Sequence, residues 1–476
     1  MEGILIGRER QIEQLKSAQQ SSKPEMVALV GRRRVGKTYL VKQVYGKDIR
    51  FQLTGLQDAD TRRQLRNFAL SMDRYFPAFD IGVSEDWLAA FHQLGKALDA
   101  LPEGEKPVLF LDELPWLATN KSGFVSALGY FWNNWASQRR VVLVVCGSAA
   151  SWMIRKIIND RGGLHNRVTR LIYLFPFTLG ETERYCQSRN IRLSRFQMLQ
   201  IYQAMGGIPM YLDQLEPGLS AVQNIQRICF EETGYLRNEF ERLFASLFAN
   251  YERHVEIVRL LAAKRRGITR QEIIQHSKLS NGGGLTTTLE ELEKSGFITA
   301  YGGYKKKVRD QLYRLTDLYT HFYLTYLEPL GKSARPDFIK LSDLPKYKGW
   351  AGYAYETVCL THIDAIRGAL SIGGMSSTVA SFIAGATKEM PGAQIDLLID
   401  RSDQSINLCE IKFSANPFRI TKAVAENLET KKRVFAYHTG TRKHLFSTLI
   451  TTFGTAPSDY LASHVDQVLG LDDLFS

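Results

Sequence analysis

Eight residues near the start of the chain have the types and spacing needed to bind phosphate groups. They fit the pattern G-x-x-x-x-G-K-S/T and are Gly31, Arg32, Arg33, Arg34, Val35, Gly36, Lys37 and Thr38. Glycines let consecutive backbone N–H groups point at phosphate oxygens, and a following helix offers its positive N-terminal end. In such a loop the lysine reaches the β- and γ-phosphates, and the hydroxyl binds Mg²⁺. The pattern therefore predicts a nucleoside triphosphate site.

The elements on both sides of this loop agree with that interpretation. Residues 26–30 are an apolar run that predicts a buried strand, and residues 39–44 have the spacing of a helix. A glycine-rich turn that matched by chance would not need this strand and helix, so chance is the weaker explanation.

Two carboxylates follow a second apolar run. Residues 108–111 predict a buried parallel strand, and Asp112 and Glu113 come directly after it. The carboxyl ends of strands in α/β sheets are where binding sites lie. We expect Asp112 to hold Mg²⁺ opposite Thr38, and Glu113 to polarise the attacking water as general base. The alternative is that the two acids cap the next helix.

A third predicted strand, residues 141–146, leads to Ser148, which we expect to sense the γ-phosphate, with Ser151 behind it. Further along, Arg167 and then Arg170 are candidates to stabilise charge on the transferred phosphoryl group, in their own or a neighbouring subunit. The alternative, that both arginines pair with surface acids, stays open.

Taken together, these motifs resemble archaeal-type AAA+ ATPases of the STAND-related branch. The resemblance covers about the first half of the chain and rests on I-G-R-E, G-R-R-R-V-G-K-T, F-L-D-E-L-P-W-L, C-G-S-A-A-S-W-M and G-G-I-P-M-Y-L. It implies ATP and Mg²⁺ as cofactors, a P-loop core over residues 1–177 and a helical lid over 178–249. A homo-oligomer is possible in such a family. Relatives often carry glycine where this chain has Asn166, which puts the role of Arg167 in doubt.

Residues 250–330 have the order helix, helix, helix and hairpin, which resembles a winged helix-turn-helix. Thr269 and Glu272 form a predicted capping box, and residues 297–301 and 311–315 predict two strands. The hairpin tip, residues 305–309, is basic and would suit phosphates. The predicted recognition helix carries three glutamates, which would repel them. Packing against the core or a partner protein is therefore an equal alternative to DNA binding.

The last part of the chain holds a second set of chemically capable residues. Asp396 lies in a predicted strand, and Glu410 and Lys412 lie on one face of the next strand. Carboxylates bind a divalent metal, and lysine positions or deprotonates a nucleophile for phosphodiester cleavage. Asp400 shares a face with Asp396 and is an alternative ligand.

This D-x13-E-x-K arrangement resembles the PD-(D/E)xK nuclease-like fold, here as a DUF234-type domain over residues 337–476. Glu356, on a predicted helix, matches the acid that many members supply from their first helix, and residues 433–437 are expected to form a later strand. The proline of the family name is absent. A degenerate fold kept for DNA binding or packing is the alternative to an active magnesium site.

Composition sets the remaining expectations. The chain has 476 residues and a net charge of +12, which favours several domains and a polyanionic partner such as DNA. The five cysteines are scattered, and no apolar run approaches the length of a membrane span, so we expect a cytoplasmic protein that does not enter a membrane. The predicted fold class is multidomain α/β. The leading hypothesis is an ATPase that controls a DNA nuclease, perhaps against foreign or mobile DNA; a nucleotide-switched binding protein and a signalling ATPase are the alternatives.

Overall fold

The computed structural model describes residues 5–79, 82–102, 104–248, 250–264, 266–305, 311–330, 337–342 and 344–476. The chain divides into two compact units, Met1–Pro176 and Phe177–Ser476. The three segments expected after residue 177 all fall in the second unit. No helix among the described residues has the length and apolar character needed to cross a membrane.

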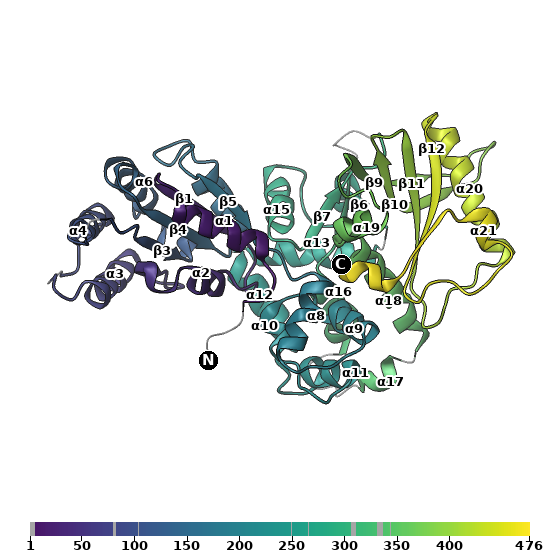
Figure 1. Cartoon of the computed structure of the whole chain (residues 1–476), viewed down its shortest axis with the longest axis horizontal. Coiled ribbons are helices and arrows are strands. Elements are labelled where there is room, and N and C mark those ends of the chain that lie inside the picture. The colour runs from purple at the N-terminus through teal and green to yellow at the C-terminus, as the bar shows by residue number, and fades with distance from the viewer. Residues whose placement is uncertain are drawn as a thin grey trace. The chain divides into compact units, whose positions relative to one another are not determined.

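The first unit is built on a parallel five-stranded sheet (Figure 1). Its strands lie in the order β2-β3-β4-β1-β5. Their bounds are β1 Glu25–Val30, β2 Ile49–Thr54, β3 Val108–Asp112, β4 Val142–Gly147 and β5 Arg170–Tyr173. Every residue of β1, β3 and β4 is buried, which explains why these strands are continuous apolar runs in the sequence.

Helices of the first unit cover this sheet and bury a core rich in aromatic rings, among them Phe68, Trp87, Phe91 and Phe131. The α-helices are α1 Glu9–Gln20, α2 Lys37–Tyr45, α3 Thr61–Tyr75, α4 Trp87–Asp99, α5 Leu114–Leu117, α6 Phe124–Asn134 and α7 Ala150–Met153.

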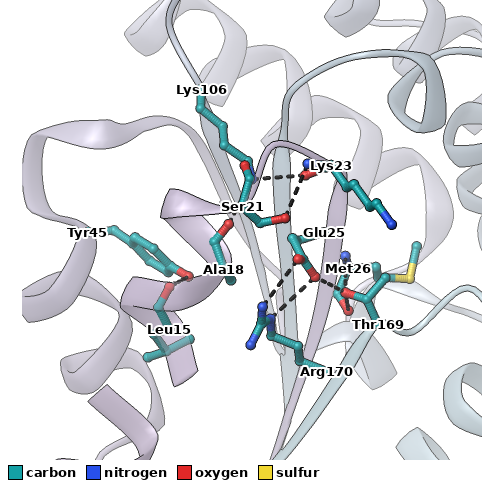
Figure 2. Close-up of polar contacts among 10 residues, drawn as sticks. All are labelled: Leu15, Ala18, Ser21, Lys23, Glu25, Met26, Tyr45, Lys106, Thr169 and Arg170. Atoms are coloured by element: carbon teal, nitrogen blue, oxygen red, sulfur yellow. Dashed lines mark hydrogen bonds and ion pairs between the residues drawn. The ribbon is translucent and has the colours of Figure 1, made fainter. Parts of the chain in front are cut away.

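One end of α1 is held by a buried lysine. The ammonium group of Lys106 donates to the carbonyl oxygens of Ala18 (2.7 Å), Ser21 (2.7 Å) and Lys23 (2.9 Å), as Figure 2 shows. The last carbonyls of a helix have no partner within the helix. Lys106 therefore both caps α1 and joins it to the chain segment that leads into β3.

The second unit begins with helices that end near residue 248. They are α8 Leu179–Ser188, α9 Arg195–Met205, α10 Pro209–Leu212, α11 Ala221–Ile225 and α12 Glu239–Leu247. Inside this unit they are fixed to a later helix, α18 (Pro345–Thr361): the side chain of Gln203 donates to the carbonyl oxygen of Ala351 at 3.0 Å.

The middle of the second unit has the element order helix, strand, two helices and a hairpin. The bounds are α13 Tyr251–Ala263, β6 Ile268–Thr269, α14 Arg270–His276, α15 Gly283–Lys294, β7 Ile298–Tyr301 and β8 Leu312–Leu315. The three strands form an antiparallel sheet in the order β6-β8-β7. The capping box of Thr269 and Glu272 is present at the start of α14. The predicted basic tip, apart from Lys305, lies outside the described residues. Two further helices follow the hairpin, α16 Leu318–Phe322 and α17 Phe338–Leu341.

The last part of the second unit is a mixed five-stranded sheet in the order β13-β12-β11-β10-β9. Strands β9, β10 and β11 are antiparallel neighbours, whereas β11, β12 and β13 are parallel. The elements after α18 are α19 Ile363–Ala369, β9 Ser377–Ala384, β10 Ala393–Arg401, β11 Ser405–Lys412, α20 Lys422–Thr439, β12 His444–Thr451, α21 Leu461–His464 and β13 Gln467–Leu469.

One predicted strand is wrong. Residues 433–437 are part of α20, and β12 begins only at His444. The segment contains Val434 and Phe435, which favour strands locally, but both side chains are buried against Ile406 and Leu408 of β11. Burial against the sheet as one face of an 18-residue helix outweighs the weak local preference.

Candidate functional site

The phosphate loop connects β1 to α2 with the backbone that the motif requires. A Cβ atom on Gly31 would lie 2.4 Å from the carbonyl oxygen of Leu174, so only glycine fits there. Gly36 has a φ of +92°, a left-handed conformation that glycine adopts without strain. The loop thus turns tightly and places Lys37 in the first turn of α2.

The side chain of Lys37 lies inside this loop. Its ammonium donates to the carbonyl oxygens of Gly31 (2.8 Å) and Arg32 (3.0 Å) and to the hydroxyl of Ser148 (3.1 Å). Burial lowers the pKa of Lys37, while the nearby Cys146, Glu113 and Asp112 act in the opposite direction. The ammonium is therefore a buried positive group at the place where phosphates would enter.

The other loop residues are placed as follows. Arg32 and Val35 are buried, and the carbonyl oxygen of Val35 accepts from Arg8 at 3.5 Å. The guanidinium of Arg33 lies 5.9 Å from the ring centre of Trp116, which belongs to the D-E-L-P-W segment. Arg34 has a φ of +73°.

Thr38 and Asp112 meet as predicted. The Thr38 hydroxyl donates to Oδ2 of Asp112 at 2.7 Å. The other carboxylate oxygen, Oδ1, accepts from the thiol of Cys146 at 2.6 Å and from the backbone N–H of Glu113 at 2.9 Å. Burial raises the pKa of Cys146, and Asp112 adds to the effect, so the thiol stays protonated and donates. Asp112 is thereby fixed with one oxygen turned to Thr38.

Glu113 and Ser148 also meet, because β4 lies between β1 and β3 in the sheet. One carboxylate oxygen of Glu113 accepts from the Ser148 hydroxyl at 2.5 Å, and the other accepts from the Ser148 backbone N–H at 3.0 Å. Ser148 therefore bridges Lys37 and Glu113. The sequence predicted this position for Ser148, and the structure brings all three side chains together.

The two candidate arginines lie elsewhere. Arg170 opens β5 beside Val27, and its guanidinium contacts both carboxylate oxygens of Glu25 at 3.3 Å (Figure 2). Burial alone would raise the pKa of Glu25, but hydrogen bonds from Thr169, Arg170 and Ser21 lower it. For Arg170, pairing with an acid is thus the observed arrangement.

Arg167 is exposed in the loop that enters β5. Because β1 and β5 are parallel, this loop lies at the edge of the sheet opposite the phosphate loop. A contact of Arg167 with a nucleotide in its own subunit is therefore disfavoured. Its role towards a neighbouring subunit stays a prediction.

The second candidate site lies in the C-terminal sheet. Glu410 and Lys412 share one face of β11 as predicted, and their side chains form an ion pair at 2.7 Å. The other carboxylate oxygen of Glu410 pairs with Lys431 of α20 at 2.6 Å. Burial alone would raise the pKa of Glu410, but the two lysines hold it below the ordinary value.

Glu356 and Asp396 lie within electrostatic reach of this pair. Burial raises the pKa of Glu356 to about 7, and the negative charge of Asp396 contributes. Lys412 interacts with Glu410, Asp396 and Glu356, which together raise its pKa against the effect of burial. The predicted set therefore gathers in one place. Asp400, the alternative ligand, instead pairs with Lys443 at 2.5 Å.

The two sites differ in their fit to a divalent metal. Thr38 and Asp112 present adjacent hydroxyl and carboxylate oxygens, the donors that Mg²⁺ prefers. In the C-terminal site each of Glu356 and Glu410 is already paired with a cationic side chain. Among the described residues, no three acidic, histidine or cysteine side chains form a group able to hold a metal ion. As it stands, the second site does not fit a bound metal.

Three contributors were missed from the sequence. Cys146 precedes Ser148 by two residues on the same strand, and that spacing was a usable signal. Arg314, a lone cation within the short strand β8, pairs with Glu356 at 3.0 Å. Lys431 gave no signal, because only the packing of α20 brings it to Glu410.

Comparison with known proteins agrees with the first site. Residues 5–215 match a family model described as an ATPase domain predominantly from Archaea. An uncharacterized protein of Methanocaldococcus jannaschii is 20% identical over 436 residues, which cover 90% of this chain and 92% of that protein.

Solved structures show the same relationship. The Walker-type ATPase of Pyrococcus abyssi has a TM-score of 0.50 and 18% identity, and the match covers 67% of this chain and 96% of that one. The ORC2 protein of Aeropyrum pernix has a TM-score of 0.40 and 15% identity, covering 75% and 96%. With the phosphate loop and the Asp112–Glu113 pair, these findings identify residues 5–215 as an ATPase domain of the kind found predominantly in Archaea.

Proposed function

We propose that this chain hydrolyses ATP and that its nucleotide state controls a DNA-cleaving site within residues 337–476. One observation carries the second half of the proposal. Glu356, Asp396, Glu410 and Lys412 come from one helix and two strands, and their charges meet in one place. Alternating charges on an exposed strand would not need a buried glutamate from a separate helix.

In the ATPase site each side chain has a defined task. Lys37, held by Ser148 and two carbonyl oxygens, would exchange these contacts for phosphate oxygens. Thr38 and Asp112 would hold Mg²⁺, which supplies charge neutralisation on the phosphates. Glu113, oriented by Ser148, would take a proton from the attacking water.

The order of elements in the C-terminal part supports a nuclease-like fold. Helix α18 precedes three antiparallel strands, then α20 crosses to the parallel strand β12. This is the layout that the resemblance implies, with a winged helix over residues 250–330 as an additional grip. A net charge of +12 favours a nucleic acid as the partner, with foreign or mobile DNA as the expected target.

A plasmid-cleavage assay with Mg²⁺ and ATP tests the proposal. We expect Glu410→Ala and Lys412→Ala each to reduce cleavage by about 100-fold or more, the scale of losing a catalytic group. Glu426→Ala is a matched control, since Glu426 lies exposed on α20 and pairs only loosely with Lys422 at 3.9 Å. Lys37→Ala should remove the dependence on ATP. Cleavage that is unchanged in the first two variants, or absent throughout, would refute the nuclease.

A second candidate is a nucleotide-switched DNA- or protein-binding regulator with a non-catalytic nuclease-like fold. The observation that favours it is the pairing of Glu356 and Glu410 with cations. Tight DNA binding that depends on ATP, without cleavage in the same reactions, would select this candidate. If the Lys37→Ala protein responded to ATP as the wild type does, the switch would be refuted.

A further inference from the structure

The hairpin of β7 and β8 is attached to the C-terminal sheet. Gly303 and Ser381 of β9 form a parallel bridge, and the backbone N–H of Tyr304 donates to the Ser381 carbonyl at 2.9 Å. The ring of Tyr304 lies 5.1 Å from that of Phe435 on α20. The segment that the sequence predicts as a wing for DNA thus adds to the sheet that carries the acidic residues.

Arg314 of this hairpin reaches the acidic residues themselves. Its side chain is 3% exposed, and Nη2 donates to Oε2 of Glu356 at 3.0 Å. The same nitrogen is 3.4 Å from the Tyr353 carbonyl oxygen and 3.4 Å from the Thr357 hydroxyl. The guanidinium also stacks over the Tyr353 ring at 4.3 Å. Arg314 is therefore bound to α18 on several sides.

This contact is a poor way to gain stability. Burying an ion pair costs desolvation that its attraction often fails to recover. The Nε atom of Arg314 is buried, and no hydrogen-bond partner is found for it among the described residues. Apolar side chains at both positions would pack without that cost. The pair is better explained by what it does to Glu356 than by the stability it adds.

Glu356 is the acid that a divalent cation would need. It interacts with Asp396 and Lys412, so a cation bound among these acids would share the Glu356 carboxylate. Arg314 already holds that carboxylate, and two positive groups on one buried carboxylate repel each other strongly. This accounts for the lack of fit to a metal in the docked arrangement.

We infer that Arg314 and a divalent cation compete for Glu356, so that docking of the 298–315 hairpin and loading of the acidic site exclude each other. The hairpin is then an internal inhibitor of the site, a role that rests on the proposed nuclease for its biological meaning. Because coupling of this kind is reciprocal, cation binding must also loosen the hairpin. Any ligand that draws the hairpin away raises the affinity for the cation.

Binding of Mn²⁺ to the full chain tests the competition. An Asp112→Asn background removes metal binding at the ATPase site, and free Mn²⁺ is measured by electron paramagnetic resonance. We expect Arg314→Gln to bind Mn²⁺ at least tenfold more tightly, Arg314→Lys to gain less, and Arg314→Gln with Glu356→Gln to lose the gain. Equal affinity with and without Arg314→Gln, or a gain that survives Glu356→Gln, overturns the inference.

A second variant leaves Arg314 in place, because a buried substitution can impair folding. Bridged residues lie at the separation that a disulfide spans, so a Gly303→Cys and Ser381→Cys pair should lock the hairpin when oxidised. The five native cysteines are all buried, which keeps oxidation selective. The locked form should bind Mn²⁺ at least tenfold more weakly than its reduced form. Equal binding by the two forms overturns the inference.

Plasmid cleavage by the same substitutions without Asp112→Asn separates this inference from the nuclease proposal. Tighter Mn²⁺ binding by Arg314→Gln with no cleavage in any protein supports the competition and refutes the nuclease. Cleavage with unchanged Mn²⁺ affinity supports the nuclease and refutes the competition.

Discussion

Ser148 is the residue on which the ATPase site depends most for its arrangement. It donates to Glu113 with both its hydroxyl and its backbone N–H, and its hydroxyl also accepts from Lys37. Such a link between the lysine and the acid is retained only if the polar side chain stays. The serine therefore orients the group that acts on water, whereas the loop alone binds phosphate.

From this follows a split between binding and turnover. We expect Ser148→Ala to lower kcat for ATP hydrolysis by about 10- to 100-fold, because Glu113 loses its orienting hydroxyl, while the Kd for ATP changes by less than about threefold. Steady-state turnover and nucleotide titration measure the two. Ser151→Ala, on the neighbouring α7, is the control and should leave both nearly unchanged. A loss of binding as large as the loss of turnover contradicts this role.

His362 gives the second unit a defined pH dependence. Its side chain is buried, Nδ1 lies 2.8 Å from the Val358 carbonyl oxygen, and Nε2 accepts from the Leu179 backbone N–H at 3.0 Å. The ring must therefore be neutral, with the proton on Nδ1. Burial lowers the pKa of His362 to about 4.

The sign of this effect follows from linkage. The unfolded chain binds a proton below its ordinary pKa of about 6.5, whereas the folded chain does not until about pH 4. The stability is thus full above about pH 6.5 and falls as the pH is lowered to 4, by up to about 3 kcal/mol. Urea unfolding at several pH values should show a flatter dependence in His362→Gln than in the wild type. The exposed His438→Gln control should keep the wild-type slope, and equal slopes in all three proteins would contradict the assignment.

Among the secondary-structure elements, α1 depends on a partner far away in the sequence. Three backbone carbonyls at its end converge on the ammonium of Lys106. We expect Lys106→Met to lower the free energy of unfolding of the first unit by about 2 kcal/mol, because buried carbonyls lose a charged donor. Lys16→Met, at an exposed site on α1, is the control and should change stability by less than about 0.5 kcal/mol. Urea unfolding measures both, and equal effects would contradict the capping role.

The parts of the fold that the sequence predicts well are those decided locally. Buried parallel strands are continuous apolar runs, so β1, β3 and β4 stand out, and their carboxyl ends bring Lys37, Asp112 and Ser148 to one edge. The hairpin of β10 and β11 is equally plain, because alternation and a short turn define it.

The remaining parts are decided by contacts between distant segments. Residues 433–437 prefer a strand locally but lie in α20, since the helix buries Val434 and Phe435 on the sheet. The pairing of Arg314 with Glu356 joins residues 42 positions apart and leaves no periodic pattern. For the same reason the attachment of the β7–β8 hairpin to β9 could not be anticipated. The sequence therefore predicts the contents of the C-terminal site but not the cations that occupy it.

For the whole molecule, the open question is whether ATP bound in the first unit changes the second. Nucleotide binding stabilises the first unit by about 2.7 kcal/mol when its concentration is about 100-fold above Kd. Hydrogen exchange should therefore slow in β1, β3 and α2 in the wild type and not in Lys37→Ala. That response alone would be expected of any nucleotide-binding domain.

Control of the C-terminal site requires more. With ATP and Mg²⁺, hydrogen exchange in the 298–315 hairpin or in α18 must also change, because only a shift in hairpin docking frees Glu356 from Arg314. The oxidised Gly303→Cys and Ser381→Cys protein is the matched control, and it should keep the response of the first unit while losing that of the hairpin. Mass spectrometry of peptides from both units measures this in one experiment. If the nucleotide response stays within residues 5–176, the two sites work independently and the proposed control fails, whatever the activity of each site.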